Sequence, residues 1–222
     1  MPQIKVRTNS RAWINSDTNI IVPVSIHSAF HQGALGIQKM HAMISYIVSH
    51  AKNVTIVLTD RAHIHTLSLT YENDLKKAFD ICRADAFALA QNFASLFASC
   101  KIVYWDDIIS DKIKYECYKQ QLNQLYEQDS FFCALLQNDA EKTFTSNRAQ
   151  IFPDKEIYVE KAKTDIIEQT AFHLILAYEG YRFMLYPGRT YQAITYAQHI
   201  FLPAENRITH VNINIKINNK HS

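Results

Sequence analysis

The sequence predicts an α/β protein, built as a single doubly wound domain with helices on both faces of a mostly parallel sheet. Two apolar runs, residues 20–24 and 54–58, are typical of buried strands, and residues 36–50 between them carry apolar side chains at helical spacing. Such a strand–helix–strand unit normally makes a right-handed crossover between parallel strands. The 222 residues contain no internal repeat and no linker-like segment, so we expect one domain over residues 1–222.

The middle of the chain continues this alternation. Residues 72–99 place apolar side chains at intervals of three and four, which predicts a long helix. Residues 101–105 then read as a third strand, and residues 111–143 as one or two further helices, because no breaker interrupts them. The polar and proline-containing residues 146–154 predict a loop.

The last third of the chain adds two helices and two strands. Residues 157–179 have a helical pattern that a glycine ends, and residues 181–186 form a fourth strand followed by Pro-Gly. A short helix comes next. Residues 211–218 alternate apolar and polar side chains with a period of two, as expected for a half-exposed edge strand.

Composition excludes several classes of protein. With 48% hydrophobic and 12% aromatic residues the chain is not of the disordered type. It has only four glycines and neither glycine-rich phosphate loop motif, so a phosphate-binding loop of that type is not expected. The start is polar and no apolar run is long enough to span a bilayer, so we expect a cytoplasmic protein without membrane contact. The four cysteines are widely spaced and no metal-ligand motif occurs, so no metal site is expected.

Ser25 is the first candidate for chemistry, because it ends a predicted buried strand. Ligands of open α/β folds bind at the carboxyl ends of the strands. A serine between a strand and a helix is also a common cap or turn residue, and both interpretations stay open on this observation alone. His27 and His31 follow closely, but the Gly-x-Ser-x-Gly elbow of the α/β hydrolases is absent, so a catalytic triad has no support.

Two further side chains are candidates. Glu168 lies in an apolar stretch of the predicted helix 157–179, where a half-buried carboxylate can hold an amine or act as a general base. Its alternative is a solvated helix face. Tyr186 ends the fourth strand, where its phenol can bind a serine hydroxyl or a ligand carbonyl, or pack as an ordinary strand tyrosine.

The net charge is only +2, so we do not expect the whole surface to bind nucleic acid. Basic residues gather locally in two predicted helices, and such groups form either a solvated face or a patch that contacts phosphates. The candidates are Lys76, Lys77, Lys112, Lys114 and Lys119.

Taken in order along the chain, these segments resemble the tRNA-dependent cyclodipeptide synthases. The resemblance covers roughly residues 20–203 and rests on Ser25 with Ser28 three residues on, a second strand that ends at Asp60, the helix around Glu168, and Tyr186-Pro187. One subfamily has Asn at the marker position and Tyr-His at the late strand end. The other varies at the marker and has Tyr-Pro, so this chain resembles the second.

The resemblance implies a Rossmann-like domain similar to the catalytic domain of class I tyrosyl-tRNA synthetases. It implies that two aminoacyl-tRNAs serve as substrates in a ping-pong reaction, without cofactor or metal. Ser25 would accept the first aminoacyl group, Glu168 would hold its α-amino group, and Tyr186 would orient the serine or the acyl carbonyl. The second aminoacyl-tRNA would then yield a dipeptidyl enzyme, which cyclises to a diketopiperazine. A monomer is expected.

Substrate-binding residues follow from the same resemblance and from strand geometry. Ile21 and Pro23 share one face of the strand with Ser25, so they line the aminoacyl pocket or belong to the core. Ser28 and Pro187 occupy the subfamily positions. The family commonly has a tyrosine one helical turn before the glutamate, where this chain has Thr164.

Two other functions compete with cyclodipeptide synthesis. A non-catalytic module that binds RNA or a nucleotide on the same scaffold is the main alternative, because a fold does not carry an activity by itself. A serine hydrolase that uses His27 or His31 is the third interpretation.

Overall fold

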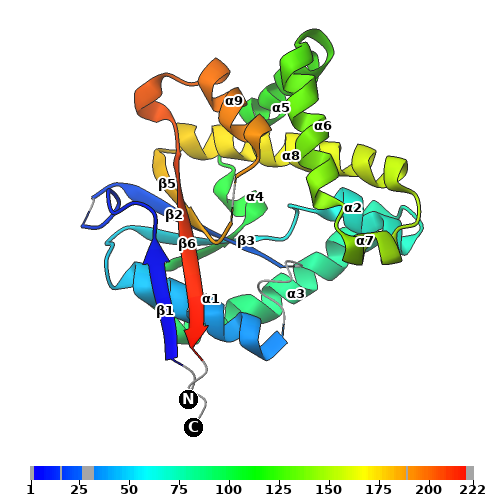
Figure 1. Ribbon diagram of the computed structural model, residues 1–222. Helices are drawn as coiled ribbons and strands as arrows, with labels where there is room; N and C mark the ends of the chain where they lie inside the picture. Colours follow the sequence, from blue (N-terminus) through cyan, green and yellow to red (C-terminus); the bar gives the residue numbers. More distant parts are fainter. Residues whose placement is uncertain (1–2, 16, 27–32, 189, 219–222) are drawn as a thin grey trace.

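The computed structural model describes residues 3–15, 17–26, 33–188 and 190–218. In this part of the chain, six strands form one sheet in the order β1-β6-β5-β2-β3-β4 (Figure 1). The strands are β1 (Gln3–Thr8), β2 (Asn19–Ser25), β3 (Val54–Thr59), β4 (Lys101–Tyr104), β5 (Tyr181–Tyr186) and β6 (Thr209–Asn218). All neighbouring strands pair in parallel except β1, which is antiparallel to β6. The predicted mostly parallel α/β sheet is confirmed.

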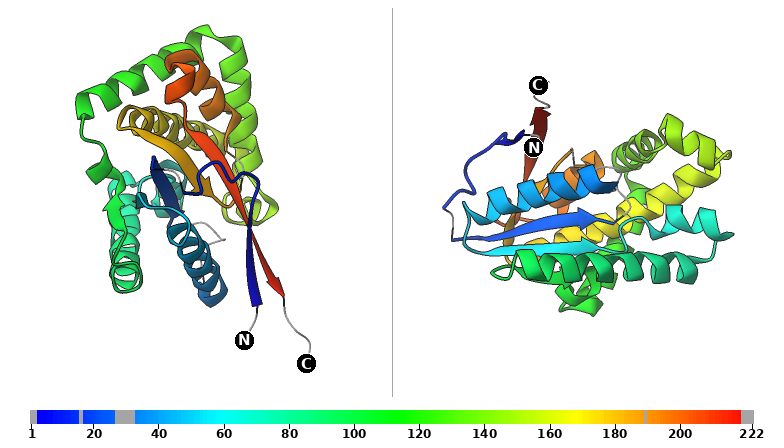
Figure 2. Two further views of the ribbon diagram at one scale, coloured as in Figure 1. Left: turned by 90° about the vertical axis from the view of Figure 1, so that its left-hand side faces the viewer. Right: turned by 90° about the horizontal axis from the view of Figure 1, so that it is seen from below.

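Helices cover both faces of this sheet. The long helices are α1 (Gly33–Val48), α3 (Leu75–Leu96), α5 (Lys112–Gln128), α6 (Ser130–Thr143), α8 (Lys155–Tyr178) and α9 (Gln192–Phe201). Figure 2 (left) shows α1 and α3 on one side of the sheet and the other four on the opposite side. Shorter pieces are α2 (Ile64–Ser68), α4 (Trp105–Ile108), α7 (Ser146–Ile151) and two 3₁₀ turns, Leu69–Tyr71 and Ala204–Asn206.

The alternation of side chains along β2 divides the core in two. Ile20, Val22 and Val24 pack against α1 and α3, in a cluster that includes the fully buried Met40 and Phe93. The odd-numbered positions face α8 instead, and Ile21 lies there in the second cluster. Because successive strand residues point to opposite faces, Ser25 must also lie on the α8 side.

Aspartate side chains fix where several helices begin. Asp74, Asp111 and Asp154 each accept a hydrogen bond from a backbone N–H in the first turn of α3, α5 and α8. Such caps satisfy amides that have no partner inside the helix, and each stabilises its helix by about 1 kcal/mol. None of the helices in the described ranges is both long and apolar enough to cross a membrane.

Three details of the predicted elements are wrong. The predicted loop at 146–154 contains the short helix α7, and Trp105 begins α4 rather than ending a strand. The last strand is not at the edge, because β1 covers it. β6 pairs with β5 over its first four residues and with β1 from Ile213 onward.

The packing of α3 leads to a test of the core. Phe93 is fully buried against the sheet, whereas Phe87 on the same helix is 57% exposed. Phe93→Ala should lower the free energy of unfolding by roughly 3–5 kcal/mol, because it leaves a cavity. Phe87→Ala should change it by less than about 0.5 kcal/mol. Urea denaturation measures both, and equal losses would show that α3 does not pack as described.

Candidate active site

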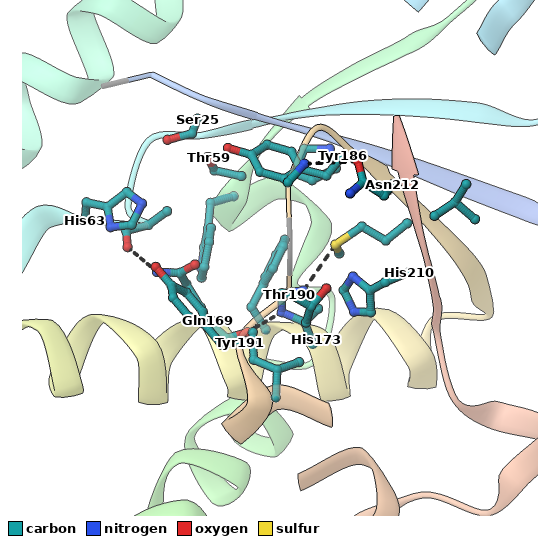
Figure 3. A pocket seen from close by; sticks show the side chains of 18 of the residues that line it. Ser25, Thr59, His63, Gln169, His173, Tyr186, Thr190, Tyr191, His210 and Asn212 are labelled. Carbon is teal, nitrogen blue, oxygen red and sulfur yellow. Dashed lines mark hydrogen bonds between the residues drawn. The ribbon is translucent and has the colours of Figure 1, made fainter. Parts of the chain in front are cut away.

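A cavity of about 510 Å³ opens where three parallel strands end. Ser25, Thr59 and Tyr186 are the last residues of β2, β3 and β5, and all three line it (Figure 3). Ser25 is paired in register with Thr59, whose hydroxyl donates a 3.0 Å hydrogen bond to the Val24 carbonyl oxygen. The sheet therefore fixes the backbone under Ser25 on the strand side where ligands bind in open α/β folds.

Tyr186 reaches into this cavity from the neighbouring strand. Figure 3 shows its ring extending from β5 toward Ser25. The chain turns sharply after it, and Gly188 has a φ of 137°, a backbone conformation that side chains other than glycine rarely adopt. The Gly188 N–H lies 3.4 Å from the Asn212 side-chain oxygen on β6. Tyr186 itself lies between β2 and β6, because it is the last residue of β5, the strand between them.

Helix α8 supplies the opposite wall. Gln169, Phe172 and His173 line the cavity, as expected for positions three and four residues apart on one helix face. The Gln169 amide nitrogen donates a 2.6 Å hydrogen bond to the Ala62 carbonyl oxygen, which leaves Oε1 as its acceptor. Phe172 stacks on Trp105 with ring centroids 3.9 Å apart. This wall therefore combines stacked aromatic rings with the polar groups of Gln169 and His173.

Two histidines form one end of the cavity. The rings of His173 and His210 stack with centroids 5.3 Å apart. Burial lowers the pKa of His173 to about 4, and burial together with the neighbouring His173 lowers the pKa of His210 to about 3. Both imidazoles are therefore neutral at neutral pH.

Permanently charged side chains are missing from the described lining. None of the described residues around the cavity is Asp, Glu, Lys or Arg. Within the described ranges, no group of three or more His, Cys, Asp or Glu side chains could hold a metal ion. The described walls are thus suited to a neutral ligand.

The structure does not bring Glu168 into this cavity. Glu168 is 7% exposed, and its Oε1 lies 3.1 Å from Lys119 Nζ on α5 and 3.5 Å from His65 Nε2 on α2. Burial acts to raise the pKa of Glu168, but His65 and the charge of Lys119 outweigh it and lower the pKa to about 2. Glu168 is a carboxylate that joins α8 to α2 and α5. The alternative interpretation of Glu168, a residue on a solvated helix face, is excluded by its burial.

Buried Asp165 makes a second connection between α8 and α2. Its two carboxylate oxygens accept hydrogen bonds of 3.0 Å from the backbone N–H groups of His65 and Thr66. Burial raises the pKa of Asp165 to about 7 despite these donors. Together with Glu168, it holds the start of α2 against α8, next to the cavity residues Ala62 and His63.

Of the predicted substrate-binding residues in the described part of the chain, one lines the cavity and the others lie elsewhere. Pro23 lines the cavity beside Ser25, whereas Ile21 lies fully buried below it and Pro187 is outside the lining. Thr164 is exposed on α8, with its hydroxyl bonded to the Glu160 carbonyl oxygen. Ser28 lies outside the described residues, as do His27 and His31.

The predicted basic patch does not form one surface. Lys76 and Lys77 are exposed at the start of α3, on the face of the sheet opposite to α5. Lys112 is exposed at the start of α5, and the ammonium of Lys114 lies 3.3 Å from the centroid of the Tyr178 ring. Lys119 turns inward and binds Glu168.

Sequence reasoning missed most of the cavity wall. Gln169, His173, Tyr191 and His210 were not among the candidates, although all line the cavity. The spacing of residues 169, 172 and 173 indicates that they share one face of α8, but not that this face lines the cavity. For His210 the sequence holds no such signal, because its place depends on the pairing of β6 with β5.

Comparison with known proteins identifies the fold. No protein-family model and no curated protein matches the sequence. The structure of a cyclodipeptide synthase (CDPS) from Fluoribacter dumoffii matches with a TM-score of 0.84 and 16% identity, over 98% of this chain and 100% of that one. A cyclodipeptide synthase from Candidatus Glomeribacter gigasporarum bound to Phe-tRNAPhe matches with a TM-score of 0.69 and 15% identity, over 94% and 92%.

A tyrosyl-tRNA synthetase from Archaeoglobus fulgidus, complexed with L-tyrosine, has a TM-score of 0.55 and 15% identity, over 92% of this chain and 57% of that one. These likenesses define the class of fold. The chain has the fold of the cyclodipeptide synthases, which is similar to that of a class I tRNA synthetase, as expected from the sequence.

Proposed function

We propose that this protein is an aminoacyltransferase that makes a cyclic dipeptide from two aminoacyl-tRNAs. The observation that carries the proposal is the position of Ser25, which is 6% exposed at a strand end and lines the cavity together with Tyr186. The shared fold with cyclodipeptide synthases supports the same reaction. A hydroxyl held beside a pocket of this size is suited to accept an acyl group.

In the first step, the Ser25 Oγ attacks the ester carbonyl carbon of an aminoacyl-tRNA. The new Oγ–acyl bond forms as the bond to the tRNA ribose oxygen breaks, and the serine proton passes to that leaving oxygen. One ester replaces another, so the step depends on placement more than on a strong base. Tyr186 is the group we propose to orient Ser25 or the acyl carbonyl through its phenol.

In the second step, the amine of the aminoacyl group on Ser25 attacks the ester carbonyl carbon of another aminoacyl-tRNA. A peptide bond forms as the bond to the second tRNA ribose oxygen breaks, the amine proton passes to that leaving oxygen, and the dipeptide stays esterified to Ser25. The free amine then attacks the Ser25 ester carbonyl, which closes the six-membered ring and releases the serine hydroxyl. Each step exchanges acyl bonds without an oxidant or a cofactor.

Glu168 and Gln169 take different parts in this proposal. Glu168 was expected to hold the α-amino group, but its Oε1 binds Lys119 and lies near His65 outside the cavity. We therefore propose Glu168 as a positioning residue that fixes α8 against α2 and α5. The Oε1 of Gln169 is the acceptor we propose for the α-amino group, because the Gln169 amide nitrogen is already bound to Ala62.

Production of the cyclic dipeptide tests the function. The protein is expressed in a bacterium, and the medium is analysed by mass spectrometry for diketopiperazines absent from the empty-vector control. Soluble protein without any such product, which also binds charged and uncharged tRNA equally well, would favour the non-catalytic RNA-binding alternative. Reaction of the protein with a fluorophosphonate would favour the serine hydrolase.

Removing one hydroxyl tests the proposed part of Tyr186. Tyr186→Phe should lower the rate of product formation about 10²-fold, as found for single donors that stabilise acyl transfer, while stability changes by less than about 1 kcal/mol. The matched control is Tyr178→Phe, at an exposed tyrosine on α8. An unchanged rate for Tyr186→Phe would exclude a part for the phenol in the reaction.

A further inference from the structure

One end of the cavity carries a hydrogen-bonding capacity that the reaction at Ser25 does not use. Figure 3 shows His173 and His210 on the α8 and β6 side, away from Ser25. Between the two elements, Met184 of β5 also lines the cavity and is paired in register with His210. A substrate bound to Ser25 would thus direct any group at its far end toward these imidazoles.

The hydrogen bonds of His173 determine which of its nitrogens carries the proton. Its Nδ1 lies 2.6 Å from the Gln169 carbonyl oxygen, and a carbonyl can only accept, so Nδ1 is the donor. Because the ring is neutral, Nε2 then holds a lone pair. That nitrogen lies 3.1 Å from the Met184 sulfur, which has no proton to give. His173 therefore points an acceptor into the cavity without a donor to match it.

His210 adds a second unmatched atom. Its Nε2 is buried and has no hydrogen-bond partner among the described residues. A buried polar atom without a partner costs roughly 1–3 kcal/mol, so native structures rarely keep one unless a ligand or water fills the place. His210 Nε2 without a partner in the described part of the chain, beside His173 Nε2 with only the Met184 sulfur as a neighbour, indicates a built recognition site for a polar group at the end of the cavity.

We propose that this imidazole end selects an aminoacyl substrate whose side chain is uncharged, has an apolar body, and carries a hydrogen-bond donor at its tip, as the phenol of a tyrosyl group does. The inference rests on the proposed function and names the substrate class of the same site. The apolar body would lie along the wall made by Trp105, Phe172 and Ile194, which line the same cavity.

Charge supports the same choice. The described lining has no carboxylate to pair with a lysyl or arginyl group and no lysine or arginine to pair with an acidic one. The low pKa values of both histidines keep the imidazoles from becoming cations at neutral pH. A charged side chain would be buried here without a counter-ion, which is costly.

The test compares two substrates that differ by one hydroxyl. The purified protein is incubated with Tyr-tRNATyr or Phe-tRNAPhe carrying labelled amino acids, and the label bound covalently to the protein is measured over time. A site built to bind a hydroxyl discriminates strongly against the analogue that lacks it, so we expect tyrosyl transfer to be faster by at least about 10-fold. Seryl-, lysyl- and glutamyl-tRNA should each transfer less label to the protein than tyrosyl-tRNA does.

Replacing the imidazoles should remove this preference. His173→Phe and His210→Phe keep a ring of similar size without the nitrogen atoms, so the ratio of tyrosyl to phenylalanyl transfer should fall to about threefold or less. His199→Phe is the matched control, because His199 is exposed on α9, and it should keep the wild-type ratio.

The outcomes separate this inference from the proposed function. If the wild-type protein transfers phenylalanyl as fast as tyrosyl, or prefers a charged group, the inference is overturned while acyl transfer stands. A ratio unchanged in both histidine variants also overturns it. If no aminoacyl-tRNA labels the wild-type protein, the proposed function fails. The ratio of tyrosyl to phenylalanyl transfer in the wild-type protein tests the proposed substrate preference even if a histidine variant does not fold.

Discussion

Ser25→Ala is expected to abolish the covalent aminoacyl-enzyme and to reduce cyclic dipeptide formation by more than about 10³-fold. The reason is chemical, because alanine has no oxygen to form the ester on which both later steps depend. The change removes one atom from a residue that lies 6% exposed at a strand end, so the fold should remain intact. Labelled aminoacyl-tRNA followed by denaturing gel analysis measures the acyl-enzyme directly.

A matched control keeps this result interpretable. Ser95→Ala removes the same atom from an exposed serine on α3, whose hydroxyl bonds only to the Asn92 carbonyl oxygen in its own helix. Its activity should equal that of the wild type. If Ser25→Ala still produced the cyclic dipeptide at more than about a tenth of the wild-type rate, a covalent intermediate on Ser25 would be excluded.

Glu168→Gln is expected to cause the second large effect, a loss of folding stability. This substitution leaves the Lys119 ammonium facing an amide in a mostly buried place, with only the exposed Glu116, 3.6 Å away, as a counter-ion among the described residues. Removal of one partner from a buried ion pair typically costs about 3–5 kcal/mol, so we expect a loss of stability toward the lower end of that range. The double variant Glu168→Gln with Lys119→Met should recover much of the lost stability, since the buried ammonium is removed and Glu116, which loses its partner, is exposed to solvent. Lys112→Met, at an exposed lysine of the same helix, should change stability by less than about 0.5 kcal/mol.

The pH dependence of stability gives this pair a separate signature. The folded-state pKa of Glu168 is lowered to about 2 from 4.5. A group with a lowered pKa contributes stability that is complete above its unfolded-state value and is lost as the pH falls toward the folded-state value. Wild-type stability should therefore fall between about pH 4.5 and pH 2 more steeply than that of the double variant. Parallel curves would show that Glu168 is not held by Lys119 and His65.

Activity distinguishes a positioning part of Glu168 from a direct one. If the carboxylate acts by fixing α8, the double variant should recover product formation together with stability. If it holds the substrate amine, product formation should remain low in the double variant even when the protein is as stable as the wild type. The second result would place Glu168 in contact with substrate and contradict our assignment of Gln169.

Long apolar patterns predicted the architecture of this protein because they depend on local periodicity. The apolar runs of β2 and β3 predict buried strands, and the spacing in α1 and α3 gives each of these helices a buried face, so the elements fit one layered sheet. Helix α8 is buried around most of its circumference, so its pattern determines no face. The helices α4 and α7 are too short to show the repeating apolar pattern that identifies a helix in a sequence, so they were not predicted. β1 was missed because its pairing joins Gln3 to Asn218 across nearly the whole chain, which no local pattern reveals.

Strand ends were predicted better than helix faces. Ser25 and Tyr186 both line the cavity, as expected for residues at the carboxyl ends of parallel strands. Asp60, one residue after β3, instead binds Arg83 at 2.7 Å and the Trp105 N–H at 3.3 Å. On α8, one residue corresponds to a rotation of about 100°, so Gln169 faces the cavity while Glu168 does not. The sequence alone could not determine that rotation.

The mass of the protein after contact with substrate tests the central claim most directly. The protein is mixed with one aminoacyl-tRNA, quenched in acid, digested and analysed by mass spectrometry. We predict an added mass equal to one aminoacyl residue on the peptide that contains Ser25, lost in Ser25→Ala and on addition of a second aminoacyl-tRNA. Cyclic dipeptide formation without any mass added to that peptide, or with the mass on another residue, would contradict the proposed mechanism.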